Sequence, residues 1–271
     1  MGNLQSRTVK LSDGLGEARY PANLLAKGDT NTKLRKSAGQ GFVTAGLSLS
    51  PHKVAGVGNV CPFASKGCMA ACLDHQGMAS VWKTIEQGRT NRTRLFYADR
   101  DYFLERLSVE IGNRKRTAGK SGQRLAVRLN VFSDISWEKV APQLFSNHPD
   151  VQFYDYTKNP NRAGALLHNY WVTFSKSEQN QDDAMRILAD AGNVAVVFAD
   201  SQNNYAGNRS GLQQLPSSWR GYRVINGDES DLRFQDARGR KHGRIVGLKL
   251  KAHSRQERNQ AIDSGFAVAW N

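Results

Sequence analysis

Short apolar runs alternate with segments of helical periodicity over most of the chain. Runs of four to eight residues rich in Val, Ile, Leu and Phe are typical of buried strands. We therefore predict strands at residues 42–49, 125–132, 151–156, 170–174, 194–199, 222–225, 245–250 and 266–270. Helices are predicted at residues 80–111, with a break near Tyr97 where Asp99 can cap a second helix, and at 138–145, 162–168 and 181–191.

This alternation predicts an α/β fold. Eight short strands separated by helices favour a complete or partial parallel (β/α) barrel with its helices on the outside. An open doubly wound sheet is the structural alternative. Residues 1–40 are polar and rich in Gly, Asn and Lys, so we predict an N-terminal arm with at most short structured pieces. Residues 41–271 then form a single barrel-like domain with a cysteine loop after the first strand.

Composition narrows the class of protein. The chain has 271 residues, of which 39% are hydrophobic. That composition excludes a collagen-like or wholly disordered protein. The longest apolar run, at residues 194–199, is far shorter than the roughly 20 residues that cross a bilayer, so we predict no membrane span. An odd number of cysteines, three, favours a reducing, cytoplasmic location over secretion.

The charge is strongly positive and uneven. The net charge is +14, and residues 1–120 contribute +10 of it. A basic N-terminal half is typical of proteins with a polyanionic partner such as nucleic acid, although a merely soluble basic surface explains it equally well. In the first interpretation the phosphate contacts would be Arg89, Arg92, Arg94, Arg114, Lys115 and Arg116.

All three cysteines, Cys61, Cys68 and Cys72, lie within twelve residues. Thiolates brought together in this way can bind a metal centre, because the cation lowers their pKa and offsets their mutual repulsion. Two alternatives stay open. Three cysteines can hold a [4Fe–4S] cluster whose fourth iron is open, or His75, with His52 as another choice, can complete a Cys3His zinc site.

Barrel geometry predicts where further chemistry lies, because the active sites of such barrels are at the C-terminal ends of the strands. Polar residues follow several predicted strands. We select as candidate catalytic residues Asp134, Asp155, Lys158 and Lys176. The candidate cofactor-binding residues are Asn226, Asp228 and Glu229, which follow the sixth predicted strand.

Several segments resemble a known family. Besides the cysteine loop, they are residues 91–96, 128–137, 151–160 and 226–234. Here the sequence resembles the phage gene product 88 family, from about Phe42 to the C-terminus. The resemblance implies an origin in a phage or mobile element, and hence the host cytoplasm, but it implies no reaction.

A cysteine loop after the first strand is also similar in layout to the radical S-adenosylmethionine superfamily. The spacing here is C-x6-C-x3-C, whereas the superfamily usually has C-x3-C-x2-C. The similarity implies that the open iron binds the methionyl group of S-adenosylmethionine. Our first hypothesis is therefore an iron–sulfur enzyme of this layout that acts on nucleic acid or a nucleotide-derived substrate. The alternatives are a non-catalytic nucleic-acid-binding protein with a structural zinc or cluster, and an enzyme whose open iron acts as a Lewis acid.

Overall fold

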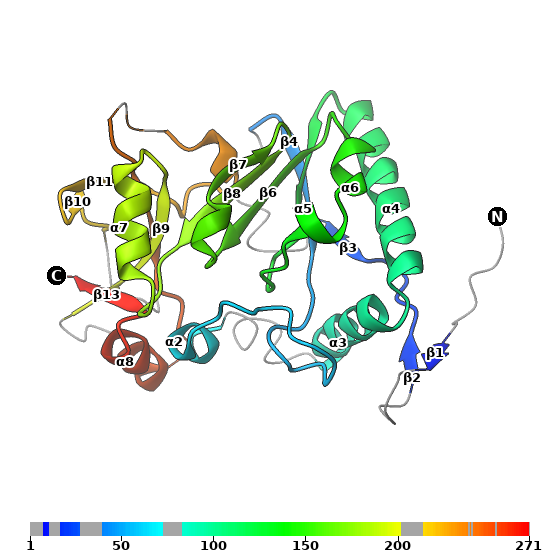
Figure 1. Cartoon of the computed structure of the whole chain (residues 1–271), viewed down its shortest axis with the longest axis horizontal. Helices are drawn as coiled ribbons and strands as arrows, with labels where there is room; N and C mark the ends of the chain where they lie inside the picture. The colour runs from blue at the N-terminus through cyan, green and yellow to red at the C-terminus, as the bar shows by residue number, and fades with distance from the viewer. Residues whose placement is uncertain are drawn as a thin grey trace. The chain divides into compact units, whose positions relative to one another are not determined.

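The computed structural model describes residues 8–10, 17–27, 40–72, 83–201, 214–237, 239, 241–252 and 254–270. The chain divides into two compact units. Unit 1 comprises Met1–Pro62 and Met78–Phe153, and unit 2 comprises Phe63–Gly77 and Tyr154–Asn271. Figure 1 shows the elements of the chain with their labels.

The main sheet is mixed and open, so the predicted barrel is wrong. Its eleven strands run in the order β10-β11-β12-β9-β8-β6-β5-β4-β3, with β13 added on β9 and β7 on β8. Among the described strands, β10 and β3 stand at the two ends of this order and do not pair with each other. Both end strands and β7 are antiparallel to their neighbours, so the sheet lacks the all-parallel series that a (β/α) barrel requires.

Unit 1 combines short strands with two long helices. Its elements are β1 (Thr8–Lys10), β2 (Glu17–Arg19), β3 (Leu25–Lys27), β4 (Phe42–Leu47), α3 (Lys83–Ala98), α4 (Arg100–Lys120), β5 (Arg124–Arg128), α5 (Trp137–Val140), α6 (Gln143–Ser146) and the start of β6 (Gln152–Thr157). Strands β4, β5 and β6 are parallel. Helix α4 contacts β5 and buries Phe103, Leu107 and Ile111. Part of the predicted arm is thus structured, because β3 pairs with β4.

The predicted break between two helices is confirmed. Helix α3 ends at Ala98, and Asp99 caps α4 by accepting a hydrogen bond from the Tyr102 backbone N–H at 3.3 Å. The second carboxylate oxygen of Asp99 accepts from the Tyr20 hydroxyl at 2.9 Å. The cap therefore also holds the N-terminal segment against the helix start.

Unit 2 holds the remaining elements. They are α2 (Lys66–Ala70), η4 (Pro160–Arg162), β7 (Gly164–Leu167), β8 (Tyr170–Ser175), α7 (Gln181–Ala189), β9 (Val194–Asp200), β10 (Ser218–Trp219), β11 (Tyr222–Asn226), η5 (Arg233–Gln235), β12 (Ile245–Lys249), α8 (Arg255–Asp263) and β13 (Ala267–Trp270). Strands β8, β9, β12, β11 and β13 form parallel pairs. Their core includes Phe174, Val196, Phe198 and Ile245, against which Leu188 of α7 packs.

The helix predicted at residues 162–168 is wrong. A short 3-10 turn ends at Arg162, and β7 then runs antiparallel to β8. Gly164 has φ +104°, which a helix does not allow. Arg162 is buried and donates to the hydroxyls of Thr157 and Tyr170, so tertiary hydrogen bonds decide this segment.

Strand β9 continues beyond the end of β8. Strand β8 pairs with β9 only at Val194 and Ala195. From Val197 onward, β13 pairs with that edge of β9 instead. The residues that follow β8 are therefore released from the sheet beside β13. The described part of the chain contains no helix that is long and apolar enough to span a membrane.

Candidate metal centre

Cys61 is held at the carboxyl end of the parallel strands of unit 1. Its thiol donates to the Phe132 carbonyl oxygen at 3.3 Å, and its sulfur accepts the His52 backbone N–H at 3.4 Å. The Cys61 N–H donates to the Asn59 side chain at 2.9 Å. The side chain is buried. Cys61 is thus fixed by both its backbone and its sulfur.

A polar turn after β5 supports this position. The Asn130 side-chain oxygen accepts hydrogen bonds from the Ser133 hydroxyl, the Ile135 N–H and the Trp137 indole N–H at 2.8–3.0 Å. The candidate catalytic residue Asp134 lies in this turn, and its backbone N–H donates to the Val60 carbonyl at 2.8 Å. The turn therefore ties the residue before Cys61 to the end of β5.

The same loop contacts α3. Gly58 has φ +52°, and the Tyr97 ring lies so close that a Cβ at Gly58 would overlap it. Burial raises the pKa of Tyr97 above its usual value, against the opposing effect of Arg100. Only glycine satisfies both the backbone angle and the close approach at this position.

The basic side chains proposed as phosphate contacts are largely used within unit 1. Arg89 lies over the Phe132 ring at 4.0 Å, and Arg94 donates to the Ala55 carbonyl. Arg92 donates to the Asn23 carbonyl, and burial lowers its pKa. Three consecutive residues of α4 are also engaged: Arg114 with the Leu25 carbonyl, Lys115 with Asp150 at 2.6 Å, and Arg116 with Asn113.

Cys68 and Cys72 belong to unit 2, on and just after the short helix α2. Ser65 caps α2, accepting the Cys68 N–H at 3.1 Å. The Cys68 side chain packs on an apolar cluster that includes Phe266 and Ala267. Helices α2 and α8 contact each other, as Figure 1 also shows.

Glu178, just beyond β8, binds this helix. Its two carboxylate oxygens accept the Ser65 hydroxyl and the Gly67 N–H, each at 2.7 Å. Burial acts to raise the pKa of Glu178, but these hydrogen bonds outweigh it and leave the pKa below its ordinary value. Glu178 is one of the polar residues that follow the predicted strands, but it is not among the candidates selected from the sequence, because no spacing along the chain connects it with Ser65.

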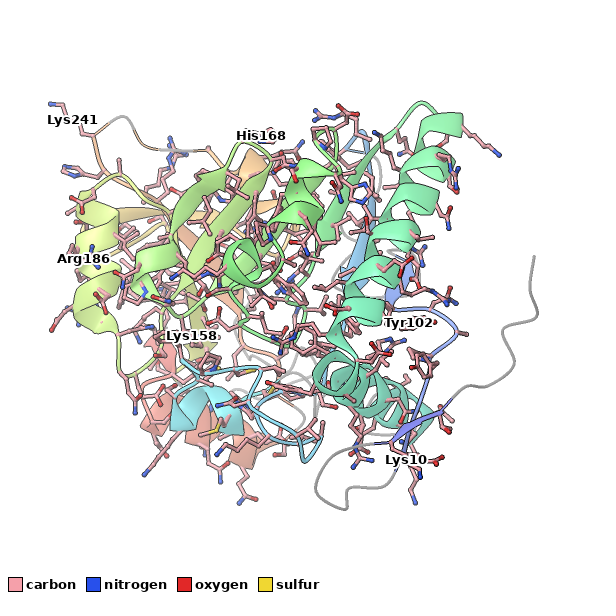
Figure 2. All side chains as sticks on the ribbon, turned by 45° about the vertical axis from the view of Figure 1, so that its right-hand side comes forward. Lys10, Tyr102, Lys158, His168, Arg186 and Lys241 are labelled. Carbon is pink, nitrogen blue, oxygen red and sulfur yellow. The ribbon has the colours of Figure 1, made fainter. Side chains whose placement is uncertain are left out.

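Two predicted catalytic lysines lie at the same end of β8. Lys158 donates to the Ser175 hydroxyl at 3.1 Å and lies over the Phe266 ring at 5.3 Å; Figure 2 shows it near α2. Lys176 is 5% exposed and donates to the Gly265 carbonyl at 2.8 Å. Burial lowers the pKa of Lys176, with Glu178 opposing. The structure thus brings Lys158, Lys176 and the α2 segment together.

Asp155 lies in the interior of unit 2 instead. It is fully buried and accepts a hydrogen bond from the Tyr170 hydroxyl at 2.8 Å, and that hydroxyl in turn accepts from Arg162. This network joins β6 to β8. Asp155 therefore stabilises the pairing of the two strands that precede Lys158 and Lys176.

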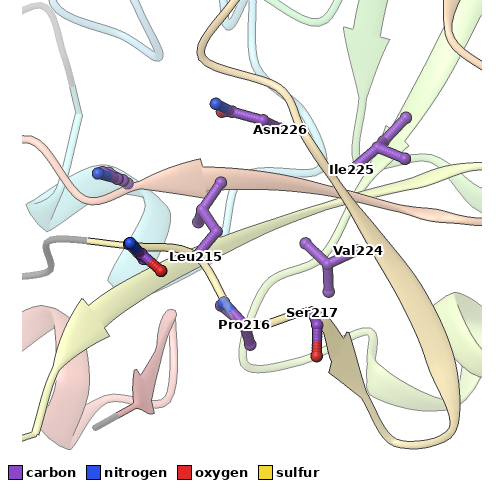
Figure 3. A pocket seen from close by; sticks show the side chains of 8 residues that line it. Leu215, Pro216, Ser217, Val224, Ile225 and Asn226 are labelled. Carbon is purple, nitrogen blue, oxygen red and sulfur yellow. The ribbon is translucent and has the colours of Figure 1, made fainter.

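The predicted cofactor residues form a turn after β11. The Asp228 carboxylate accepts the Lys249 N–H at 2.8 Å and lies 3.8 Å from the Lys251 ammonium. Asn226 donates to Glu229 at 3.0 Å. Asn226 and Lys249 also line a hollow of about 320 Å³, whose apolar wall includes Leu215, Pro216, Val224 and Ile225 (Figure 3). The hollow lies at the carboxyl ends of parallel β11 and β12, where α/β proteins bind ligands.

The donor set is chemically suited to a metal centre. None of the three cysteines is in a disulfide. Thiolates are the ligands that iron–sulfur clusters and structural zinc prefer. Within the residues that the structure describes, no three side chains of His, Cys, Asp or Glu are gathered as a metal site. His75 lies outside the described residues, and His52 contacts Cys61 through its backbone N–H.

Comparison with known proteins identifies one similarity. The profile of the family described as Gene product 88 matches residues 23–269. Neither a curated protein nor a solved structure matches the chain.

Proposed function

This chain belongs to the gene product 88 family of phage proteins, and from that premise we propose that it is an iron–sulfur enzyme whose cluster is held by Cys61, Cys68 and Cys72. The observation that carries the proposal is the anchoring of the cysteine segments at the carboxyl ends of parallel strands. In unit 1 the Cys61 sulfur contacts the residues after β5. In unit 2 Glu178, which follows β8, accepts hydrogen bonds from Ser65 and Gly67 beside Cys68. That end of a parallel sheet is the usual place for a ligand.

Chain connectivity allows one shared centre. Six residues separate Cys61 from Cys68, and three separate Cys68 from Cys72. Three thiolates satisfy three irons of a [4Fe–4S] cluster, and the fourth iron then supplies a coordination position for an external ligand. As a metal ligand, Cys61 would give up the thiol proton that it now donates to Phe132, while the His52 N–H could still donate to the sulfur.

The residues proposed to bind the cofactor and the substrate lie in unit 2. The hollow beside Asn226 and Lys249 is at the small end of the range for ligand pockets, which suits a nucleoside-sized group. The proposed ligand is S-adenosylmethionine, bound by the Asn226, Asp228 and Glu229 turn. Lys158 and Lys176 would orient an anionic, nucleotide-derived substrate. Asp155 would hold the sheet that carries them, and Asp134 would hold the loop of Cys61.

The first test measures the metal. We expect anaerobically purified protein to be brown and to contain about four irons and four sulfides per chain. Each of Cys61→Ser, Cys68→Ser and Cys72→Ser should lose most of this iron, because two thiolates hold a cluster poorly. Met69→Leu, in the same loop but on an exposed side chain, is the matched control and should keep it.

The measurements are iron and sulfide analysis with electron paramagnetic resonance of the reduced protein. S-adenosylmethionine should change the resonance of the wild-type cluster. Full iron content in all three serine variants would contradict the proposal. A colourless protein with one zinc that is lost on His75→Ala would instead establish the Cys3His alternative.

A further inference from the structure

We infer that Glu178 is a positioning residue for the metal centre, because it fixes the segment that carries Cys68 before any metal binds. The inference rests on the proposed function for its metal. It assigns to Glu178 a role that neither the cysteine spacing nor the family comparison indicates. Glu178 would act through Ser65 and Gly67 and would not contact the metal.

The carboxylate satisfies the start of α2. The first N–H groups of a helix have no partner within the helix. Here the Gly67 N–H donates directly to Glu178 at 2.7 Å. The Cys68 N–H donates to the Ser65 hydroxyl oxygen at 3.1 Å, and that hydroxyl donates its own proton to Glu178 at 2.7 Å. One side chain thus determines the position of the residue that carries the thiol and of the residue before it.

Helix α2 depends on such contacts because it has only five residues. Isolated helices of this length are unstable in water. Its backbone is instead pressed against the end of β8 and the turn before β13. A Cβ at Gly67 would lie 2.8 Å from the Glu178 carboxylate, 2.9 Å from Phe266 Cβ and 2.9 Å from Ser264 Oγ. Any larger residue at Gly67 would push the Cys68 segment away from the strand ends.

Glu178 is itself held in place. It follows the last residue of β8, which still pairs with β9, by three residues. Lys176 fixes the turn that faces Glu178 by donating to the Gly265 carbonyl at 2.8 Å. Residues around metal ligands that orient them in this way commonly change metal affinity 10- to 100-fold when removed. This is the effect expected of Glu178.

The test uses Co²⁺ as a probe, because thiolate ligation gives it intense charge-transfer absorption. Full-length reduced protein is titrated with Co²⁺ under anaerobic conditions. We expect Glu178→Gln to weaken Co²⁺ binding roughly 10- to 100-fold, while saturation with excess Co²⁺ restores the wild-type spectrum. Asp183→Asn, an acid-to-amide change at an exposed ion pair on α7, is the control and should bind as wild type.

A double-mutant cycle separates positioning from loss of fold. Ser65→Ala should also weaken binding, and the double variant should lose less affinity than the sum of the two single losses, because both changes break the Ser65–Glu178 hydrogen bond. Melting of the metal-free variants is measured alongside, and affinities are compared at a temperature where all are folded. If folded Glu178→Gln binds Co²⁺ with wild-type affinity, or if the losses of affinity in the cycle are additive, the inference about Glu178 is wrong while the proposed function still stands. Absence of any thiolate-bound Co²⁺ or iron in the wild-type protein would overturn the proposed function together with it.

Discussion

At the scale of single residues, a buried carboxylate beside η5 makes stability depend on pH. Burial raises the pKa of Asp236 to about 6, with Arg233 opposing and Asp231 adding to the rise. Arg233 lies 3.3 Å from this carboxylate, which does not fully offset the loss of hydration. A carboxyl group whose folded pKa exceeds its unfolded pKa stabilises the fold when protonated. The contribution is therefore complete below about pH 4 and is lost as pH rises through about 6.

We expect Asp236→Asn to remove this dependence, because the amide is neutral at every pH. Between pH 4 and pH 7, the free energy of unfolding of the wild type should fall relative to that of Asp236→Asn, by at most about 3 kcal/mol. Urea denaturation at a series of pH values measures the difference. Asp183→Asn serves as the exposed control. Parallel curves for wild type and Asp236→Asn would show that the buried carboxylate has an ordinary pKa.

At the scale of elements, one side chain of α4 holds the edge strand β3. Glu110 is buried and accepts the backbone N–H groups of Leu24 and Leu25, each at 3.0 Å. Arg106 donates to the same carboxylate at 3.1 Å. A three-residue strand has little stability of its own, so this contact explains why part of a polar N-terminal region joins the sheet.

We expect Glu110→Gln to destabilise unit 1 by roughly 2–3 kcal/mol, because an amide group would face backbone donors and leave one without an acceptor. Glu105→Gln, on an exposed position of the same helix, should change stability by less than about 0.5 kcal/mol. Denaturant midpoints measure both. Hydrogen exchange should show the amides of residues 24–27 losing protection in Glu110→Gln, and unchanged protection there would disprove the link.

At the scale of the whole molecule, the net charge of +14 is the strongest global property. Three of the side chains that the sequence suggested as phosphate contacts, Arg92, Arg94 and Arg114, donate to backbone carbonyls of unit 1. They therefore support the fold. Any affinity for nucleic acid would come from the remaining exposed cations and would not depend on base sequence.

We expect duplex DNA to bind weakly, with an affinity that falls linearly in a log–log plot against salt concentration. Arg114→Gln should lower the melting temperature, since its guanidinium donates to Leu25 at 2.6 Å, but should leave the salt slope unchanged. Fluorescence anisotropy at several salt concentrations tests this, with exposed Lys120→Gln on the same helix as the control. A slope reduced by Arg114→Gln and not by Lys120→Gln would return Arg114 to the nucleic-acid interface.

The sequence by itself determined those helices and strands whose signals lie within a few neighbouring residues. The pattern at residues 42–49 and 194–199 identified strands, and Asp99 identified the helix break, because periodicity and capping act over a few residues. The cysteine spacing likewise singled out a candidate metal site, and the motifs identified the family.

Only the tertiary structure decided how the strands pair and what holds the cysteine segments. Sheet closure depends on the direction of each pair, and the antiparallel edges β3, β7 and β10 came from residues without a clear period. The helix predicted at residues 162–168 failed because Arg162 is bound by Thr157 and Tyr170. Glu178 lies 113 residues from Ser65 along the chain, so their hydrogen bond exists only once β8 and α2 have been brought together. Contacts of this kind join residues that no local pattern relates, and for that reason they are decided by the fold.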